Sequence, residues 1–162
     1  MTKHQICLHG TCISVNGEGV LILGEPGTGK SDLALRLIDE PGFGVSESLM
    51  RGKLISDDQV IVTRHENRLI ASAPATISGK LEIRGLDIVT LATQTSVHLS
   101  LVVKLQSYSA IDRHPDYATF DILGLVLPLV KIDGNSPSAP ARLRAALHWL
   151  KQPNRGLDHD DF

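Results

Sequence analysis

A glycine-rich loop between a strand and a helix constrains the fold of this chain more than any other feature. Residues 24–31 match the pattern G-x-x-x-x-G-K-[ST] at all of its fixed positions. The apolar run 20–23 before it is typical of a buried strand, and residues 32–39 after it favour a helix that ends before Pro41. This order of elements is that of a P-loop, in which glycines let backbone N–H groups turn toward a phosphate.

The loop predicts a binding site for a nucleoside triphosphate or a related polyphosphate. The lysine of such a loop, here Lys30, reaches the β- and γ-phosphates, and the hydroxyl of Ser31 ligates Mg²⁺. The N-terminus of the following helix adds its partial positive charge. The residues that the motif assigns to this site are Gly24, Glu25, Pro26, Gly27, Thr28, Gly29, Lys30 and Ser31.

Composition is that of an ordinary globular protein and excludes several other classes. The 162 residues favour one domain, expected over residues 1–152, followed by a polar tail at 153–162. A net charge of −2 provides no basic field for nucleic acid, and no apolar run is long enough to cross a bilayer. Residues 1–4 do not resemble a signal peptide, so we expect a cytoplasmic protein with no membrane partner.

Two cysteines, Cys7 and Cys12, lie near the N-terminus. Their spacing matches neither a zinc-binding pair nor a redox C-x-x-C motif. In a cytoplasmic protein we expect both to be reduced and to pack as small apolar side chains.

Apolar runs and turn residues predict many strands and few helices. The strands are expected at residues 6–15 with a break at His9-Gly10, and at 20–23, 54–56, 60–63, 69–73, 97–105 and 124–132. Pro128 places the last of these near a sheet edge. A second helix is expected at 141–151, and irregular segments at 42–53 and 107–121. A doubly wound fold would alternate strands with helices, so we expect a strand-rich α/β fold around the P-loop.

An adjacent pair of carboxylates, Asp57 and Asp58, follows the expected strand at 54–56. Mg²⁺ beside a P-loop takes oxygen ligands beyond the loop hydroxyl, commonly from a carboxylate at a strand end. Paired aspartates also serve as turn residues. The P-loop favours the metal or catalytic interpretation of this pair.

Four segments together resemble the HPr kinase/phosphorylase family: His9-Gly10, the P-loop, Ile55-Ser56-Asp57-Asp58, and the string L-E-I-R-G-L at residues 81–86. That string resembles the family's own signature. The resemblance extends from about His9 to the helix at 141. It implies the P-loop fold of the HPr kinase and PEP carboxykinase-like type, and only the catalytic domain, as in a short proteobacterial form.

The resemblance also implies an activity. Family members are ATP- and Mg²⁺-dependent protein kinases that phosphorylate a serine of the phosphocarrier protein HPr, and they can reverse this step by phosphorolysis. The implied partner is an HPr-like carrier protein, and the implied assembly is a homo-hexamer. Mg²⁺ is the implied cofactor and ATP the implied phosphoryl donor.

Roles for individual residues follow from the same resemblance. Asp58 corresponds to the general base that takes the proton of the target serine, and His9 to the catalytic histidine. Lys30 neutralises the phosphates, and Arg142, at the start of the last expected helix, corresponds to a late catalytic arginine. Ser31 and Glu82, the latter within the signature string, are the implied metal-facing residues.

The sequence departs from the family pattern in three places, and the third departure favours the kinase direction over phosphorolysis. The loop at 42–53 is longer than usual, Asp87 replaces a common glycine, and a C-terminal helical segment that the family links to dephosphorylation is not evident in this sequence. Two alternatives stay open. One is a small-molecule P-loop kinase or NTPase, for which residues 107–121 would form the lid. The other is a nucleotide-sensing regulator without catalysis, against which the intact Asp57-Asp58 pair argues.

Overall fold

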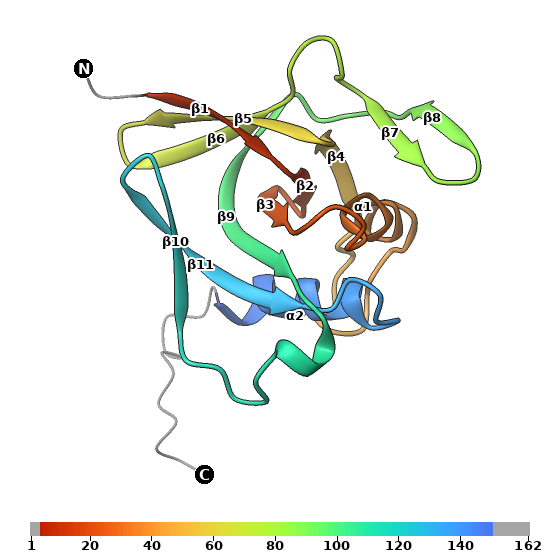
Figure 1. Cartoon of the computed structure of the whole chain (residues 1–162), viewed down its shortest axis with the longest axis vertical. Coiled ribbons are helices and arrows are strands. Elements are labelled where there is room, and N and C mark those ends of the chain that lie inside the picture. The colour runs from red at the N-terminus through yellow and green to blue at the C-terminus, as the bar shows by residue number, and fades with distance from the viewer. Residues whose placement is uncertain (1–3, 151–162) are drawn as a thin grey trace.

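A strongly curved sheet dominates the computed structural model, which describes residues 4–150 (Figure 1). Its elements are β1 (Gln5–His9), β2 (Thr11–Val15), β3 (Glu18–Leu23), α1 (Lys30–Asp39), β4 (Gly52–Ser56), β5 (Gln59–His65), β6 (Arg68–Ser72), β7 (Lys80–Ile83), β8 (Asp87–Thr90), β9 (Ser96–Leu105), a 3₁₀ turn (Tyr108–Ala110), β10 (Ala118–Ile122), β11 (Leu125–Ile132) and α2 (Ala139–Leu150). The expected strand-rich α/β fold is confirmed. The tail at 153–162 lies outside the described residues.

The long strand β9 organises the sheet. It runs parallel to β3 on one side, and its C-terminal half runs parallel to β11. Its N-terminal end pairs with β6 in the antiparallel sense. From there the sheet continues through β5 to β1, while β3 continues through β2 to β4. Because β3 and β9 are parallel and central, their C-terminal ends emerge together at the P-loop.

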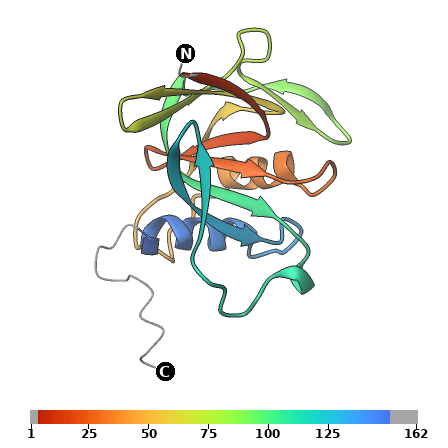
Figure 2. The ribbon, with the colours of Figure 1, turned by 60° about the vertical axis from the view of Figure 1, so that its left-hand side comes forward.

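Both faces of the central strands are buried, which explains their nearly continuous apolar sequences. Val20 and Ile22 of β3 point into a cluster with Leu33 and Leu37 of α1 and residues of α2, whereas Leu21 points into a second cluster on the opposite face. The two helices lie on the same side of β3 and β9 (Figures 1 and 2). Packing of α1 against this face fixes the direction in which the P-loop leaves the sheet.

One strand lies where the sequence predicts an irregular segment. Residues 118–122 form β10, which is an edge strand that pairs with β11 through a two-residue turn. The turn residues Leu123 and Gly124 both have positive φ, 52° and 82°. A leucine in this conformation is unusual, so the sequence pattern does not indicate a turn here. β11 itself is internal, and at Pro128 it pairs with β10 alone because pairing with β9 begins at Leu129.

Arg144 connects the two helices and is almost completely buried, with 2% of its surface exposed. Its guanidinium donates to the carbonyl oxygens of Leu37 at 3.2 Å and Glu40 at 2.6 Å, at the end of α1, and to that of Met50 at 3.0 Å. Burial lowers the pKa of Arg144, and the nearby Glu40 carboxylate opposes this shift. A Cβ atom on Gly42 would overlap the guanidinium, which explains the glycine there.

The two cysteines differ in exposure: Cys12 is buried and Cys7 is exposed, and both are free thiols. The expected apolar packing is therefore confirmed for Cys12 and wrong for Cys7. Burial raises the pKa of the Cys12 thiol well above its usual value, so it stays protonated at neutral pH.

We expect an aromatic disulfide reagent to titrate one thiol in the native protein and two in denaturant, because Cys7 is exposed and Cys12 is buried. Loss of the native reaction in Cys7→Ser would assign it to Cys7, and rapid native reaction of that variant would contradict the burial of Cys12.

Candidate active site

The P-loop has the backbone conformation that its glycines predict. Gly27 and Gly29 have φ values of 80° and 94°, in the left-handed region that side chains disfavour. Gly29 is the N-cap of α1, and no side chain caps the helix there. The N–H groups of the first helical turn therefore remain oriented toward a ligand, as in an anion site at a helix N-terminus.

Lys30 lies folded over the loop. Its ammonium donates to the carbonyl oxygens of Gly24 at 2.8 Å and Glu25 at 3.2 Å. The Thr28 hydroxyl donates to the same Glu25 carbonyl at 2.7 Å. These bonds hold the positive charge beside the backbone N–H groups, where it can neutralise a polyphosphate.

Asp57 connects the P-loop to the end of β4. The Ser31 hydroxyl lies 2.8 Å and 3.0 Å from the two carboxylate oxygens of Asp57, and the Thr11 hydroxyl donates to Oδ1 at 2.8 Å. Asp57 is 8% exposed and Thr11 is fully buried. The sequence pattern indicated the aspartate pair as a candidate site but gave no reason to single out Asp57 or Thr11.

Asp58, unlike Asp57, is open to solvent. Its side chain is 70% exposed, and its Oδ1 lies 3.4 Å from Nδ1 of His9, which is 59% exposed. Asp58 has a φ of 71°, and the N–H of Gln59 donates to the carbonyl of Asp57 at 2.9 Å. Asp58 is thus the centre of a three-residue γ-turn, which sends two adjacent carboxylates to different surroundings.

The segment at 133–138, between β11 and α2, supports the P-loop from outside. Arg36 of α1 donates to the carbonyl oxygens of Gly134 and of Ser136, the latter at 3.0 Å. A Cβ atom on Gly134 would come within 2.6 Å of the Thr28 carbonyl, so only glycine permits this approach. Arg36 also pairs with Asp32 at 3.0 Å. Through Arg36, α1 thereby holds the segment at 133–138 against the P-loop.

Described contacts join Ser31 of the P-loop to Asp57 and, separately, His9 to the adjacent Asp58, but they join neither Glu82 nor Arg142 to these residues. Glu82 lies on the exposed face of the β7–β8 hairpin, opposite Ile88. Arg142 is exposed on α2 and donates to the hydroxyl of Ser138 at 2.8 Å. Between residues 4 and 150 no hydrogen bond or ion pair connects either side chain to the P-loop. Their catalytic and metal roles stay predictions.

The residues around Ser31 suit Mg²⁺. They offer a hydroxyl and a carboxylate, which are hard oxygen ligands. Among the described residues there is no group of three or more His, Cys, Asp or Glu side chains that could enclose a metal. Mg²⁺ characteristically binds through one or two protein groups and completes its shell with water and substrate phosphates. The donor set therefore fits an ion that arrives with a nucleotide.

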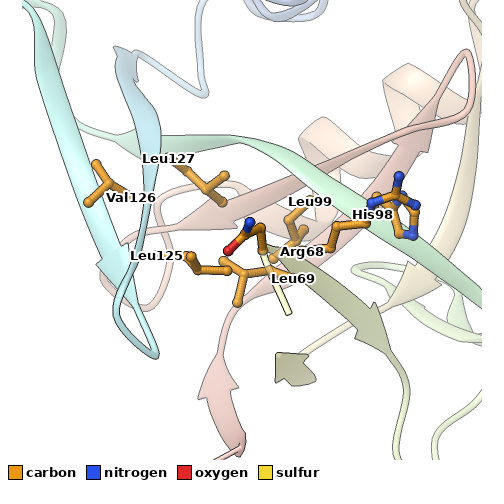
Figure 3. Close-up of a pocket in the computed structure, with 8 residues that line it drawn as sticks. Arg68, Leu69, His98, Leu99, Leu125, Val126 and Leu127 are labelled. Atoms are coloured by element: carbon orange, nitrogen blue, oxygen red, sulfur yellow. The ribbon is translucent and has the colours of Figure 1, made fainter. Parts of the chain in front are cut away.

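Two hollows lie away from the P-loop. The first, about 340 Å³, lies between β6, β9 and β11 and is lined by both apolar and polar side chains, among them Leu69, His98 and Leu127 (Figure 3). The second, about 360 Å³, lies between β11 and α2 beside Arg142 and Trp149. Of the helices that the structure describes, none is both long and apolar enough to span a membrane.

Residues 1–135 match the family described as HPr Serine kinase C-terminal domain. The HPr kinase/phosphorylase of Limosilactobacillus reuteri (strain DSM 20016) is 34% identical over 138 residues, which cover 77% of this chain and 40% of that protein. The HPr kinase/phosphorylase of Thermoanaerobacter sp. (strain X514) is 31% identical over 174 residues, which cover 96% of this chain and 53% of that protein. The chain thus spans about half or less of the length of these curated relatives.

The fold agrees with a solved structure of a similar protein. The Hpr(Ser) kinase/phosphatase from Coxiella burnetii matches with a TM-score of 0.74 and 25% sequence identity, covering 88% of this chain and 93% of that one. This agreement confirms the fold that the P-loop and the signature string predicted. The chain belongs to the family of HPr serine kinase C-terminal domains.

Proposed function

We propose that this protein is an ATP- and Mg²⁺-dependent serine kinase that phosphorylates an HPr-like phosphocarrier protein in the cytoplasm. The observation that carries the proposal is that two adjacent carboxylates, Asp57 and Asp58, differ in burial and in contacts. Asp57 is buried against the P-loop serine, while the adjacent Asp58 is exposed beside His9. The names of the similar proteins, HPr kinase/phosphorylase, support the choice of substrate.

Different residues of the site bind the nucleotide and transfer the proton. Backbone N–H groups of the P-loop and the Lys30 ammonium hold the polyphosphate, and Ser31 with Asp57 would hold Mg²⁺. The ion supplies positive charge for the β- and γ-phosphate oxygens when it is bound. Asp58 accepts the proton of the serine hydroxyl as the serine oxygen forms its bond to the γ-phosphorus. The bond from that phosphorus to the β-phosphate oxygen breaks, and ADP leaves.

The exposure of Asp58 suits a protein substrate. A serine on a folded carrier must reach the base from outside, and a 70% exposed carboxylate is accessible to it without any opening of the core. His9, 3.4 Å away, orients the carboxylate. Phosphorolysis would remove the phosphoryl group by transfer to inorganic phosphate and would use the same groups. A phosphate oxygen would bond to the phosphorus of the phosphoserine, the bond from phosphorus to the serine oxygen would break as Asp58 returns the proton to that oxygen, and pyrophosphate would leave. Assembly into a hexamer is part of the proposal through the family resemblance alone.

The proposal is tested by incubating the purified chain with Mg²⁺, labelled ATP and an HPr-like protein, followed by phosphosite mapping. We expect label on one serine of the carrier. Lys30→Ala should reduce the rate by at least about 100-fold, because the developing charge on the phosphates loses its cationic partner. Nucleotide binding with no transfer to the carrier would contradict the proposal and favour a small-molecule kinase or a nucleotide sensor, and small hydroxyl compounds would then be screened.

A further inference from the structure

The tripeptide His9-Gly10-Thr11 contacts both carboxylates of the site. His9 lies beside Asp58, the Gly10 N–H donates to the Asp58 carbonyl at 3.0 Å, and the Thr11 hydroxyl donates to Asp57. We propose that Thr11 is a positioning residue: its buried hydroxyl holds Asp57 in the orientation that lets Ser31 and Asp57 bind Mg²⁺ with the nucleotide. The inference rests on the proposed function and adds to it a residue that no sequence motif indicates.

The geometry leaves the Asp57 carboxylate little freedom. Oδ1 lies 2.8 Å from the Thr11 hydroxyl oxygen and 2.8 Å from that of Ser31, while Oδ2 lies 3.0 Å from Ser31. An ionised carboxylate only accepts hydrogen bonds, so both hydroxyls are donors. The Ser31 proton directed at Asp57 leaves the lone pairs of the Ser31 oxygen for a ligand. Thr11 fixes the carboxylate from the core side and so keeps this arrangement.

Thr11 is well suited to such a task because burial and strand pairing restrict its movement. It is fully buried on β2, a strand whose residues are all buried and which is paired with β3 on one side and β4 on the other. Its partner is 46 residues away in sequence, at the end of β4. Residues that hydrogen-bond to a metal-binding group orient that group, and their loss weakens metal affinity. Without Thr11, Asp57 would keep only the Ser31 hydroxyl as a described side-chain donor.

The test compares nucleotide binding with and without the ion. Calorimetric titration with ADP, in excess Mg²⁺ and in EDTA, measures the two dissociation constants directly. We expect Thr11→Val, which preserves shape and strand propensity, to weaken binding in Mg²⁺ about tenfold and to leave binding in EDTA within about twofold. Thr11→Ser, which restores the hydroxyl, should bind like the wild type in both conditions.

The matched control is Ser14→Ala. Ser14 lies on the same strand and is 2% exposed, but its hydroxyl is not among the described hydrogen-bond partners of Asp57. We expect this variant to change neither constant. Equal weakening by Thr11→Val in Mg²⁺ and EDTA, no weakening at all, or the same effect from Ser14→Ala would overturn the inference. Wild-type ADP binding that is indifferent to Mg²⁺ would instead overturn the proposed use of the ion, and that result needs no variant, so the two failures are distinguishable.

Discussion

The Asp58→Asn variant is expected to bind ATP as the wild type does and to phosphorylate the carrier at least about 100-fold more slowly, the usual contribution of a general base. Asparagine has the shape of aspartate but cannot take the serine proton. It also tolerates positive φ, so the γ-turn at 71° is preserved. Alanine would combine loss of the base with backbone strain, and its effect would be ambiguous. Initial rates of serine phosphorylation and a calorimetric dissociation constant for ATP together measure the effect.

The neighbouring carboxylate provides the control for this prediction. Asp57→Asn removes a charge that is buried against Ser31, so we expect it to weaken Mg²⁺-dependent nucleotide binding. The two variants thus separate the step of binding from the step of proton transfer. If Asp58→Asn transfers phosphate at the wild-type rate, Asp58 is not the base. If both variants lose only binding, the two carboxylates act together on the ion.

Motifs with a strict backbone requirement were predictable from the sequence. The P-loop glycines demand positive φ, and the flanking apolar periodicity defines β3 and α1. The turn between β2 and β3 shows the same logic, since Asn16 and Gly17 have φ values of 51° and 79° and are typical residues for it. Leu123-Gly124 adopts nearly the same conformation without the typical first residue, and so the β10–β11 hairpin could not be predicted.

The arrangement of the site was only partly predictable for a different reason. Two adjacent aspartates are equivalent in sequence, and only the γ-turn at Asp58 decides that Asp57 faces the core and Asp58 the solvent. Thr11 resembles any buried threonine of a strand until the fold brings β4 beside β2. The burial of Arg144 could not be predicted either. Arginine is usually exposed, and this one is buried because the end of α1 lies beside α2. Such long-range pairings leave no local pattern.

Replacement of Arg144 by methionine is expected to lower the free energy of unfolding by about 3 kcal/mol, because three backbone carbonyls each lose a hydrogen-bond donor, at a typical net contribution of about 1 kcal/mol per bond. Methionine fills much of the volume, so the loss reflects the hydrogen bonds more than a cavity. For a chain of this size the melting temperature should fall by about 10 °C. Thermal and urea unfolding, followed by circular dichroism, measure both quantities.

The control for this prediction lies two residues away on the same helix. Arg142 is exposed and its side chain makes one described hydrogen bond, to Ser138, so Arg142→Met should change the unfolding free energy by no more than about 0.5 kcal/mol. The same variant tests the catalytic prediction for Arg142, since an arginine that stabilises the transferring phosphoryl group would lose transfer rate while keeping stability. Equal stability of Arg144→Met and wild type would mean that α1 and the segment leading to β4 do not depend on this buried guanidinium. The pair therefore separates an arginine that holds the end of α1 in place from one predicted to act in the reaction.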